Sequence, residues 1–369
     1  MKILIFSTAY LPLTGGAEIS VKELTDRLGE EIEFDLITAR MRSHLPQVER
    51  VGKVTVYRIG VGIELLDKLL VPFLGAVKAL QLNRQKKYSY FWCIMASFAS
   101  GAAFIANWFQ KKVPIVLTLQ EGDSEEWLTH RWFGLLDLSW RLALKRTDRL
   151  TVLSTYLLDR ALRLGYIGPS YVIPNGVDTN RFKIQDVGLK NKDHITLITT
   201  SRLVEKNGVG NIIEAMKLLP ENVSLTIIGS GRLESELKHH SQILNLKSRI
   251  NFLGEVPNSE IPRHLSEADI FVRPSLSEGQ GISFIEAMAA GLPVIATPVG
   301  GIPDFLIDGE TGVFCQPRDP QSIAQAVMRL VSNPELARRI TENSSRLVRE
   351  KYDWDLIARE MKSRVFEIK

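Results

Sequence analysis

Two series of short apolar runs constrain the fold of this chain more than any other feature. The first series predicts strands at Lys2–Ser7, Phe34–Thr38, Val54–Arg58, Phe91–Ala96, Pro114–Leu119 and Arg149–Leu153. The second series predicts strands at Ile195–Thr200, Ser224–Ile228, Ile250–Leu253, Asp269–Val272, Pro293–Thr297 and Val313–Cys315. Most of these runs are continuous rather than alternating, which is typical of parallel strands that are covered on both faces.

Amphipathic stretches separate the apolar runs, and the clearest are Glu18–Leu28, Gly210–Leu219, Leu233–Leu244 and Pro320–Val331. Such alternation predicts right-handed βαβ units in a doubly wound parallel sheet. Because it occurs twice along 369 residues, we expect an α/β protein with two such domains. Ligands in these folds bind beyond the carboxyl ends of the strands, so the cleft between the domains is the expected site.

Composition excludes several other classes of protein. A hydrophobic fraction of 45% and a charged fraction of 24% argue against a disordered chain. The two cysteines are too few for a disulfide framework. Residues 1–185 contain 24 Lys and Arg against 18 Asp and Glu, so the first half of the chain suits an anionic partner.

The stretch Leu65–Arg84 is apolar and contains Lys68 and Lys78. It is compatible with an amphipathic surface that contacts a membrane or a lipid-linked acceptor. A core-facing helix with a basic outer side is the simpler interpretation. No apolar stretch is long enough to span a bilayer, since the best one, Ala96 to Phe109, falls short of ~20 residues.

The segment Ser277–Glu286 follows a predicted strand and begins a predicted helix. Gly279 and Gly281 allow the backbone to approach a ligand closely, and the free N–H groups at a helix start favour an anion. Glu278 and Glu286 can present carboxylates to different parts of one ligand, for example to sugar hydroxyls. Taken alone, a plain turn with two solvated glutamates explains the segment equally well.

A second segment, Thr200–Gly208, follows the first strand of the second series. It places Arg202 and Lys206 at a carboxyl end, which suits a diphosphate because the arginine fork can donate two hydrogen bonds to it. Gly15 and Gly16 form a comparable turn after the first strand of the chain. Each of these segments is by itself also compatible with an exposed loop.

Taken in order, these segments resemble the retaining glycosyltransferases of family 4, which have the GT-B fold. The resemblance covers nearly the whole chain. It rests on Gly15–Glu18, Ile173–Asp178, Ser201–Val204, Ile227–Gly231, Phe252–Gly254, the Glu278/Glu286 pair, Glu286–Ala289 and Gly291–Ile295. No single motif is specific, but all of them occur in the order and at the spacing of the family.

The resemblance implies two Rossmann-like domains, with residues 1–174 binding the acceptor and residues 175–352 binding a nucleotide-sugar. A final helix at about 353–369 would pack back onto the first domain. The implied donor-binding residues are Gly16, Arg202, Lys206, Asn207, Val256, Glu278, Gly279, Gly281, Ile282 and Glu286. Of these, Arg202 and Lys206 would neutralise the diphosphate, Glu286 would bind the ribose, and Glu278 would hold the sugar. Glu278, Arg202 and Lys206 are the catalytic candidates, and the resemblance implies neither a metal nor another cofactor.

The sequence departs from the family pattern at two places. The usual lysine follows the arginine by five positions, where this chain has Asn207, so either Lys206 or Asn207 is expected to meet the diphosphate. Many relatives carry His-Asp after the strand Pro114–Leu119, where this chain has Gln120 and Glu121. Both are acceptor-side candidates, although Gln120 cannot accept a proton at neutral pH.

We therefore predict a retaining hexosyltransferase that acts on a hydroxyl of a glycan or lipid-linked acceptor, in the synthesis of cell-surface polysaccharide or glycolipid. Its expected partners are a nucleotide diphosphate sugar, the acceptor and a membrane surface touched by the first domain, but no nucleic acid. The expected location is the cytoplasm, or the inner face of the membrane as a peripheral protein. A nucleotide-sugar epimerase of the same architecture and a non-catalytic sugar-nucleotide binding module are the alternatives.

Overall fold

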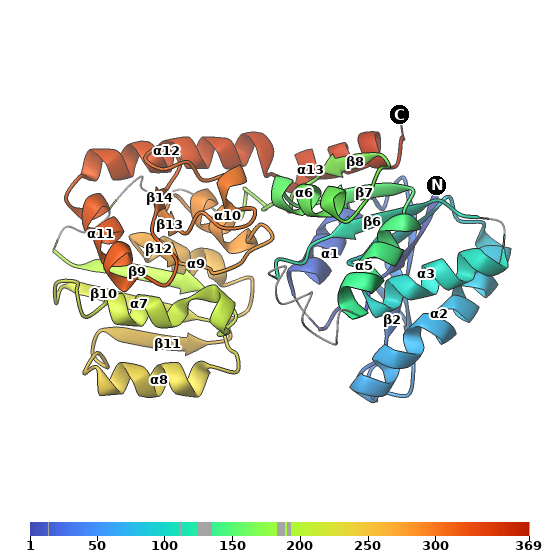
Figure 1. The fold of residues 1–369 in the computed structure, drawn as a ribbon, viewed down its shortest axis with the longest axis horizontal. Helices are drawn as coiled ribbons and strands as arrows, with labels where there is room; N and C mark the ends of the chain where they lie inside the picture. The colour runs from blue at the N-terminus through green and yellow to red at the C-terminus, as the bar shows by residue number, and fades with distance from the viewer. Residues whose placement is uncertain (14, 111, 124–134, 183–188, 190–192, 369) are drawn as a thin grey trace. The chain divides into compact units, whose positions relative to one another are not determined.

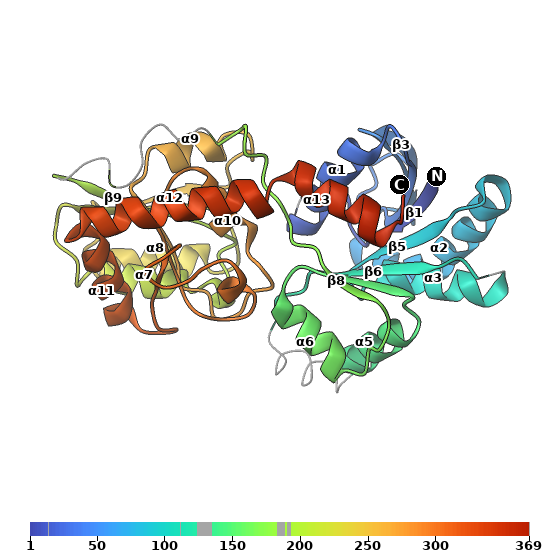
Figure 2. The same cartoon turned by 90° about the horizontal axis from the view of Figure 1, so that it is seen from above.

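The computed structural model describes the chain except residues 14, 111, 124–134, 183–188, 190–192 and 369. The described chain divides into two compact units, Met1–Asn175 with Trp354–Lys369, and Gly176–Asp353. Each unit has a sheet of mainly parallel strands with helices on its faces (Figures 1 and 2). The predicted α/β class with two doubly wound sheets is therefore confirmed.

Within the described residues, the first unit contains an eight-stranded sheet in the order β3-β4-β2-β1-β5-β6-β7-β8. The strands are β1 (Lys2–Phe6), β2 (Glu33–Ala39), β3 (Val48–Val51), β4 (Val54–Ile59), β5 (Tyr90–Ile94), β6 (Ile115–Leu119), β7 (Arg149–Val152) and β8 (Ser170–Val172). The pairing of β3 with β4 is antiparallel, and the other pairings in this order are parallel.

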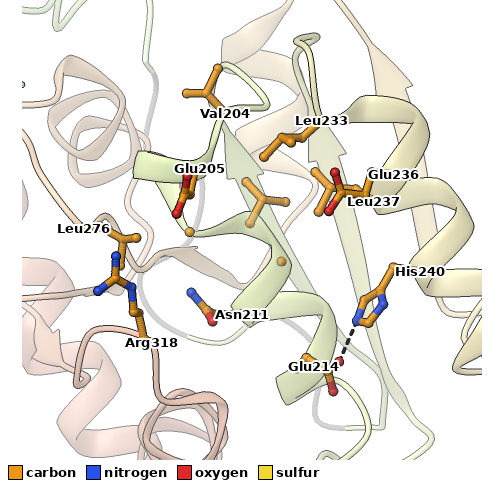
Figure 3. A pocket seen from close by; sticks show the side chains of 13 residues that line it. Val204, Glu205, Asn211, Glu214, Leu233, Glu236, Leu237, His240, Leu276 and Arg318 are labelled. Carbon is orange, nitrogen blue, oxygen red and sulfur yellow. Dashed lines mark hydrogen bonds and ion pairs between the residues drawn. The ribbon is translucent and has the colours of Figure 1, made fainter. Parts of the chain in front are cut away.

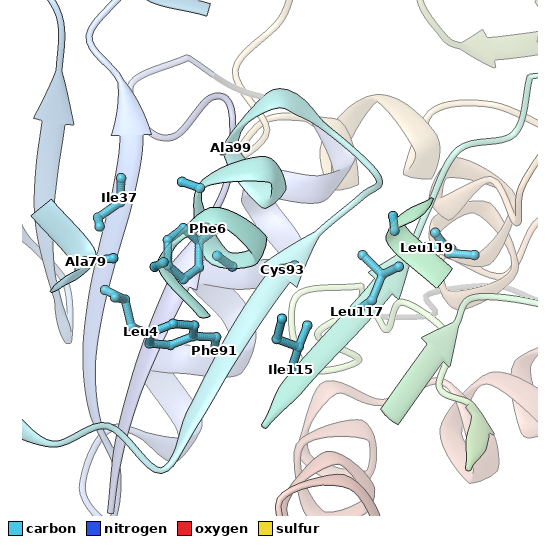
Figure 4. Packing of buried hydrophobic residues seen from close by; sticks show 14 of the residues in the cluster. Leu4, Phe6, Ile37, Ala79, Phe91, Cys93, Ala99, Ile115, Leu117 and Leu119 are labelled. Atoms are coloured by element: carbon cyan, nitrogen blue, oxygen red, sulfur yellow. The ribbon is translucent and has the colours of Figure 1, made fainter. Parts of the chain in front are cut away.

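The helices of the first unit are α1 (Gly16–Leu28), α2 (Glu64–Lys86), α3 (Phe98–Phe109), α5 (Leu135–Lys145), α6 (Thr155–Arg163) and α13 (Trp354–Glu360). On one face of the sheet, Phe6, Phe91 and Cys93 pack in a core with residues of α2 and α3 (Figure 4). Trp92, the residue between the last two, points to the other face, where its ring lies 5.7 Å from that of Phe366. The last residues of the chain thus complete the core of the first unit.

In the described part of the second unit, a six-stranded parallel sheet has the order β11-β10-β9-β12-β13-β14. The strands are β9 (Ile195–Thr200), β10 (Val223–Ile228), β11 (Ile250–Gly254), β12 (Ile270–Arg273), β13 (Val294–Ala296) and β14 (Val313–Phe314). The helices are α7 (Val209–Ala215), α8 (Glu234–Ile243), α9 (Ile261–Ser266), α10 (Ile282–Ala289), α11 (Pro320–Val331) and α12 (Pro334–Lys351). One core packs under α7 and α11 and a second under α10, so both faces are covered.

Helix α2 contradicts the interpretation of Leu65–Arg84 as a helix with a basic outer side. Its inward positions include Asp67, whose carboxylate accepts hydrogen bonds from the backbone N–H groups of Met41, Val61 and Gly62 at 2.7–3.1 Å. Its outward positions are apolar, with exposed fractions from 41% to 71% at Leu65, Leu66, Leu69, Phe73, Leu74 and Val77. The two internal lysines are engaged at the sides, one by a pair with Glu64 and the other over the Tyr57 ring.

None of the helices in the described residues combines the length and the apolar character that a bilayer span requires.

Candidate functional site

Loops that follow neighbouring strands of the second sheet are hydrogen-bonded to one another at its carboxyl edge. The N–H of Leu203 donates to the carbonyl of Ser230 at 2.8 Å, which joins the loops after β9 and β10. The N–H of Leu276 donates to the carbonyl of Lys206 at 2.7 Å, which joins the loops after β12 and β9. The loops after β9, β10 and β12 are therefore joined by backbone hydrogen bonds, and those after β9 and β12 carry most of the predicted donor-binding residues.

Two glycines allow this close approach of loops. Gly229 has φ +125°, and a Cβ at this position would lie 1.9 Å from the carbonyl oxygen of Ser201. Gly300 has φ +57°, and its Cβ would lie 1.8 Å from the carbonyl oxygen of Glu278. Both positions require glycine, because a side chain would meet rigid backbone as well as an unfavourable φ.

Arg273, the last residue of β12, lies at the centre of this edge. Its guanidinium donates from Nη1 to Ser283 Oγ at 2.6 Å and from Nη2 to Asn207 Oδ1 at 3.1 Å. Nη2 also pairs with Glu278 Oε2, and the guanidinium lies 5.0 Å from the centre of the Phe284 ring. We call Arg273, Glu278, Asn207 and Ser283 the Arg273 network. Sequence reasoning missed Arg273, although a lone cation at the end of an otherwise apolar strand is a signal that could have found it.

Several buried polar atoms at this edge have no hydrogen-bond partner among the described residues. They are Thr199 Oγ1, Thr200 Oγ1, Ser201 Oγ, Ser275 Oγ and Arg273 Nε. Since burying an unpaired polar group costs about 1–3 kcal/mol, such a concentration is expected where a polar ligand binds.

Glu286 lies inside α10, close to the Arg273 network, and is partly buried. Burial raises the pKa of its carboxyl from 4.5 to about 7, and the charges of Arg181 and Arg273 lower it to a smaller extent. Burial disfavours the ionised form of this carboxyl, and a ligand that donates hydrogen bonds stabilises that form. Ribose hydroxyls are donors of this kind.

The remaining predicted donor residues occupy the same edge in different ways. The Arg202 side chain is exposed, whereas Lys206 is partly buried in a short 3₁₀ turn, Glu205–Asn207. The N–H of Gly279 donates to Glu278 Oε1 at 3.1 Å. Gly281, at φ +83°, precedes Ile282, the first residue of α10.

Two predicted donor residues belong neither to the loops after β9 and β12 nor to α10. Val256 follows β11 and packs against the core under α10. Gly16 begins α1 in the first unit, where it is exposed and has open space around it.

The two acceptor-side candidates follow β6 in the first unit. Glu121 accepts hydrogen bonds from the backbone N–H groups of Ala96 at 3.0 Å and Gln120 at 3.1 Å. Burial raises the pKa of Glu121 to about 7, although these backbone bonds and the charge of Arg160 oppose the shift. Glu121 therefore joins the carboxyl ends of β5 and β6, and Gln120 beside it is partly buried.

A surface pocket of about 370 Å³ lies beside the donor edge, between α7 and α8 (Figure 3). Its polar lining consists of Glu205, Asn211, Glu214, Glu236, His240 and Arg318. His240 Nε2 and Glu214 Oε1 lie 2.5 Å apart across it. None of the predicted donor residues lines this pocket, and its three glutamates would repel a diphosphate.

Among the residues that the structure describes, no group of three or more His, Cys, Asp or Glu is arranged to hold a metal ion.

Two family models match the chain. Residues 14–181 match Glycosyltransferase Family 4, and residues 180–347 match Glycosyl transferases group 1. A curated relative, an uncharacterized glycosyltransferase of Methanocaldococcus jannaschii, is 33% identical over 202 residues, which are 51% of this chain and 52% of the relative. The alpha-monoglucosyldiacylglycerol synthase of Acholeplasma laidlawii is 26% identical over 93% of this chain and 92% of its own.

Solved structures with the same architecture cover the whole chain. The sucrose-phosphate synthase of Thermosynechococcus elongatus matches with a TM-score of 0.82 at 21% identity, over 99% of this chain and 98% of its own. The Anabaena protein HepE, in complex with UDP and glucose, matches with a TM-score of 0.79 at 19% identity, over 100% of both chains. At these identities the likeness concerns the fold alone.

Proposed function

Because the chain belongs to glycosyltransferase family 4 and has the GT-B fold, we propose that it is a retaining hexosyltransferase that uses a nucleotide diphosphate sugar. The observation that carries this proposal is the carboxyl edge of the second sheet. There the Arg273 network, the start of α10 and several unpaired buried hydroxyls converge.

The charges at this edge suit the cleavage of a sugar–phosphate bond. As the bond breaks, negative charge develops on the leaving diphosphate and positive charge on the sugar. Arg202 and Lys206 would stabilise the diphosphate together with the N–H groups beyond Gly281, and each well-placed donor of this kind contributes about 3–4 kcal/mol. Glu278 would hold the sugar and Glu286 the ribose.

The anomeric configuration is retained when the acceptor hydroxyl attacks the sugar on the same face that the leaving diphosphate departs from. In this scheme an oxygen of the leaving phosphate takes the proton of the acceptor hydroxyl, so the reaction needs no protein nucleophile and no metal. Val256 would contact the base through its backbone, and Gly16 would lie near the transferred group. Gln120 and Glu121 would line the acceptor side.

We further propose that the acceptor is lipid-linked and that the first unit rests on an anionic membrane. The outward face of α2 supports this, since Leu66, Phe73 and Val77 follow one another along one side of the helix and are 41–63% exposed. Two exposed cations lie at the carboxyl end of the helix. Arg84 is on the same side in its last turn, and Lys87 comes directly after the helix.

Helix α3, which packs along α2, adds aromatic side chains to this surface. Trp108 and Phe109 at its end are 69% and 73% exposed, and Arg146 lies over the Trp108 ring at 5.1 Å. Apolar residues flanked by cations and aromatic rings bind the headgroup region of anionic bilayers. The relative from Acholeplasma laidlawii is, by its name, a synthase of a glycosylated diacylglycerol.

Transfer is tested first with the donor. We expect one of UDP, GDP and ADP, and one of their sugars, to raise the melting temperature, since a ligand at 100 times its Kd adds about 2.7 kcal/mol. Glu278→Ala or Arg202→Ala should abolish sugar transfer, whereas the control Glu236→Ala, on the neighbouring pocket, should retain it. A Glu278→Ala or Arg202→Ala variant that folds and transfers at the full rate would contradict the proposal.

The two alternatives give different results. An epimerase would convert the nucleotide-sugar with no acceptor present, which incubation with the donor alone detects. A binding module would bind the nucleotide tightly and show no turnover with any acceptor. Retention is read from the anomeric configuration of the product by NMR.

Membrane contact is tested by co-sedimentation with vesicles of phosphatidylcholine, with and without an equal amount of phosphatidylglycerol. We expect binding to the anionic vesicles and its loss in Leu69→Ser/Phe73→Ser. The control Leu218→Ser/Ile243→Ser removes two exposed apolar residues of the second unit, which are 57% and 62% exposed, and should leave binding unchanged. Undiminished vesicle binding by Leu69→Ser/Phe73→Ser would contradict the proposal. It would also be contradicted if the wild-type protein formed concentration-dependent dimers that this variant abolishes, because the apolar face of α2 would then be covered by a second copy of the chain.

A further inference from the structure

A continuous chain of hydrogen bonds connects the loop of Arg202 with Glu278. Asn207 Nδ2 donates to the carbonyl oxygen of Arg202 at 2.7 Å, and Asn207 Oδ1 accepts from Arg273 Nη2 at 3.1 Å. The same Nη2 pairs with Glu278 Oε2. The chain thus runs from the loop after β9, through the end of β12, to the loop before α10.

The members of this chain are held away from solvent. Asn207 is 3% exposed, and the side chains of Arg273 and Glu278 are 10% and 14% exposed. Both Nη atoms of Arg273 are occupied, and its guanidinium lies on the Phe284 ring. Arg273 therefore acts through its neighbours rather than by touching a ligand with its Nη atoms.

We infer that Arg273 is a positioning residue for the sugar donor, which fixes the Glu278 carboxylate and, through Asn207, the loop that carries Arg202. This inference rests on the proposed function, in which Glu278 holds the sugar and Arg202 the diphosphate. Its consequence is that the sugar contact and the diphosphate contact form as one unit. A shared buried cation makes such a network cooperative, because each member is left unpaired when another is removed.

The same geometry explains why position 207, where the family pattern has a lysine, can be an asparagine in this chain. Asn207 is neutral, and the cation in this part of the network comes from Arg273 instead. Because Asn207 Oδ1 lies within hydrogen-bond distance of the guanidinium, a lysine at position 207 could place its ammonium in the space that a shortened residue 273 leaves. Lys206, by contrast, is outside the network, and its backbone carbonyl is bound by the loop after β12.

The test compares a ligand that uses the sugar and diphosphate contacts together with a nucleoside monophosphate, which lacks the sugar and the second phosphate. We expect Arg273→Met to weaken binding of the sugar nucleotide more than about tenfold, while binding of the nucleoside monophosphate changes less than about threefold. The probes are UMP, GMP or AMP and the corresponding diphosphate sugar, according to which base binds the wild-type protein. Adding Asn207→Lys to Arg273→Met should restore most of the sugar-nucleotide affinity. Asn207→Lys alone should lower it, since it places two cations against each other.

A matched control is Arg249→Met. Arg249 donates to the backbone carbonyls of Val223, Leu219 and Pro220 and lies outside the network. It should cost stability without changing the ratio of the two affinities. Equal weakening of both ligands by Arg273→Met, or no rescue by Asn207→Lys, would overturn the inference.

Hydrogen exchange without any ligand tests the inference independently of the proposed function. In Arg273→Met, and in the milder Arg273→Lys, amides of residues 201–208 and 278–282 should exchange faster together. Unchanged exchange in one segment would overturn the positioning role. A wild-type protein that binds no nucleotide, but shows the joint change in exchange, would instead contradict the proposed function alone.

Discussion

The Arg273 guanidinium and the Glu278 carboxylate form an ion pair in which neither side chain is more than 14% exposed. The two opposite charges compensate each other at a place where both side chains are largely removed from water. Removing one partner leaves the other as an unpaired buried charge, which is costly, whereas removing both is far less so.

This relationship predicts non-additive stability. We expect Glu278→Gln and Arg273→Met each to destabilise the second unit by about 3 kcal/mol, and the double variant to cost less than their sum by more than about 1 kcal/mol. All Trp residues lie in the first unit, so tryptophan fluorescence does not report on the second. Hydrogen exchange of β9 and β12 peptides in urea is the suitable measurement, and additive effects would contradict the prediction.

The pKa of Glu286 predicts a pH-dependent stability of the unliganded protein. Because burial raises this pKa from 4.5 to about 7, the folded state retains a proton that the unfolded state loses. Stability therefore falls as pH rises through this window and is constant above it. Glu286→Gln lacks this dependence, so its stability relative to wild type should improve over the same window. If the free energy of unfolding changed with pH in the same way in wild type and in Glu286→Gln, the raised pKa would not belong to Glu286.

Nucleotide affinity should depend on pH in the opposite sense. If ribose hydroxyls donate to the Glu286 carboxylate, binding favours its ionised form, and affinity should rise as pH passes through about 7. Titration calorimetry across that range checks this, and the Glu286→Gln variant should bind weakly with no such rise. A wild-type affinity that is flat over this window would count against a ribose contact.

The packing of loops at the donor edge predicts which glycines can be replaced. Gly229→Ala should destabilise the second unit by about 3 kcal/mol or more, because the new Cβ would lie 1.9 Å from a backbone oxygen at φ +125°. The control Gly254→Ala also has a positive φ, +71°, but nothing lies within 4 Å of its Cβ, so it should cost about 1 kcal/mol. Equal melting temperatures for the two variants would show that the close approach is not required.

The outward face of α2 is expected to tolerate polar substitutions, although its sequence is apolar. Leu69→Ser and Phe73→Ser should leave the stability of the first unit within about 0.5 kcal/mol of wild type, since both side chains are more than half exposed. Val71→Ser, on the same helix but fully buried, should cost about 3 kcal/mol. Tryptophan fluorescence in urea suits this unit, and a large loss in the first two variants would indicate that they pack against protein.

Much of the fold was predictable because parallel strands covered on both faces are continuous apolar runs. All strands of the two predicted series are present, with ends that differ by a few residues. The strands that were missed, β3 and β8, lack that signal. Val48–Val51 contains Glu49 and Arg50 and pairs antiparallel at an edge, and Ser170–Val172 is three residues long.

The chemistry of the site was only partly predictable. The sequence and its resemblance to the family predicted roles for Glu278 and Glu286, but the surroundings of both residues depend on contacts between loops that are far apart in the sequence. The predicted strand Asp269–Val272 ended one residue before Arg273, so the bonds of this side chain to Asn207 and Ser283 were not anticipated. The interpretation of α2 as a helix with a basic outer side was also wrong, because periodicity does not tell which of two apolar sides of a helix faces inward.

The return of the chain to its first unit has a consequence for synthesis on the ribosome. Phe366 packs on Tyr90 and Trp92, and the carbonyl of Val365 accepts a hydrogen bond from Arg149. The unit whose residues emerge first therefore cannot finish its core until the final segment has been translated. The unit translated later has all its residues by Asp353, so the nascent protein is expected to complete its domains in the reverse of their order along the messenger.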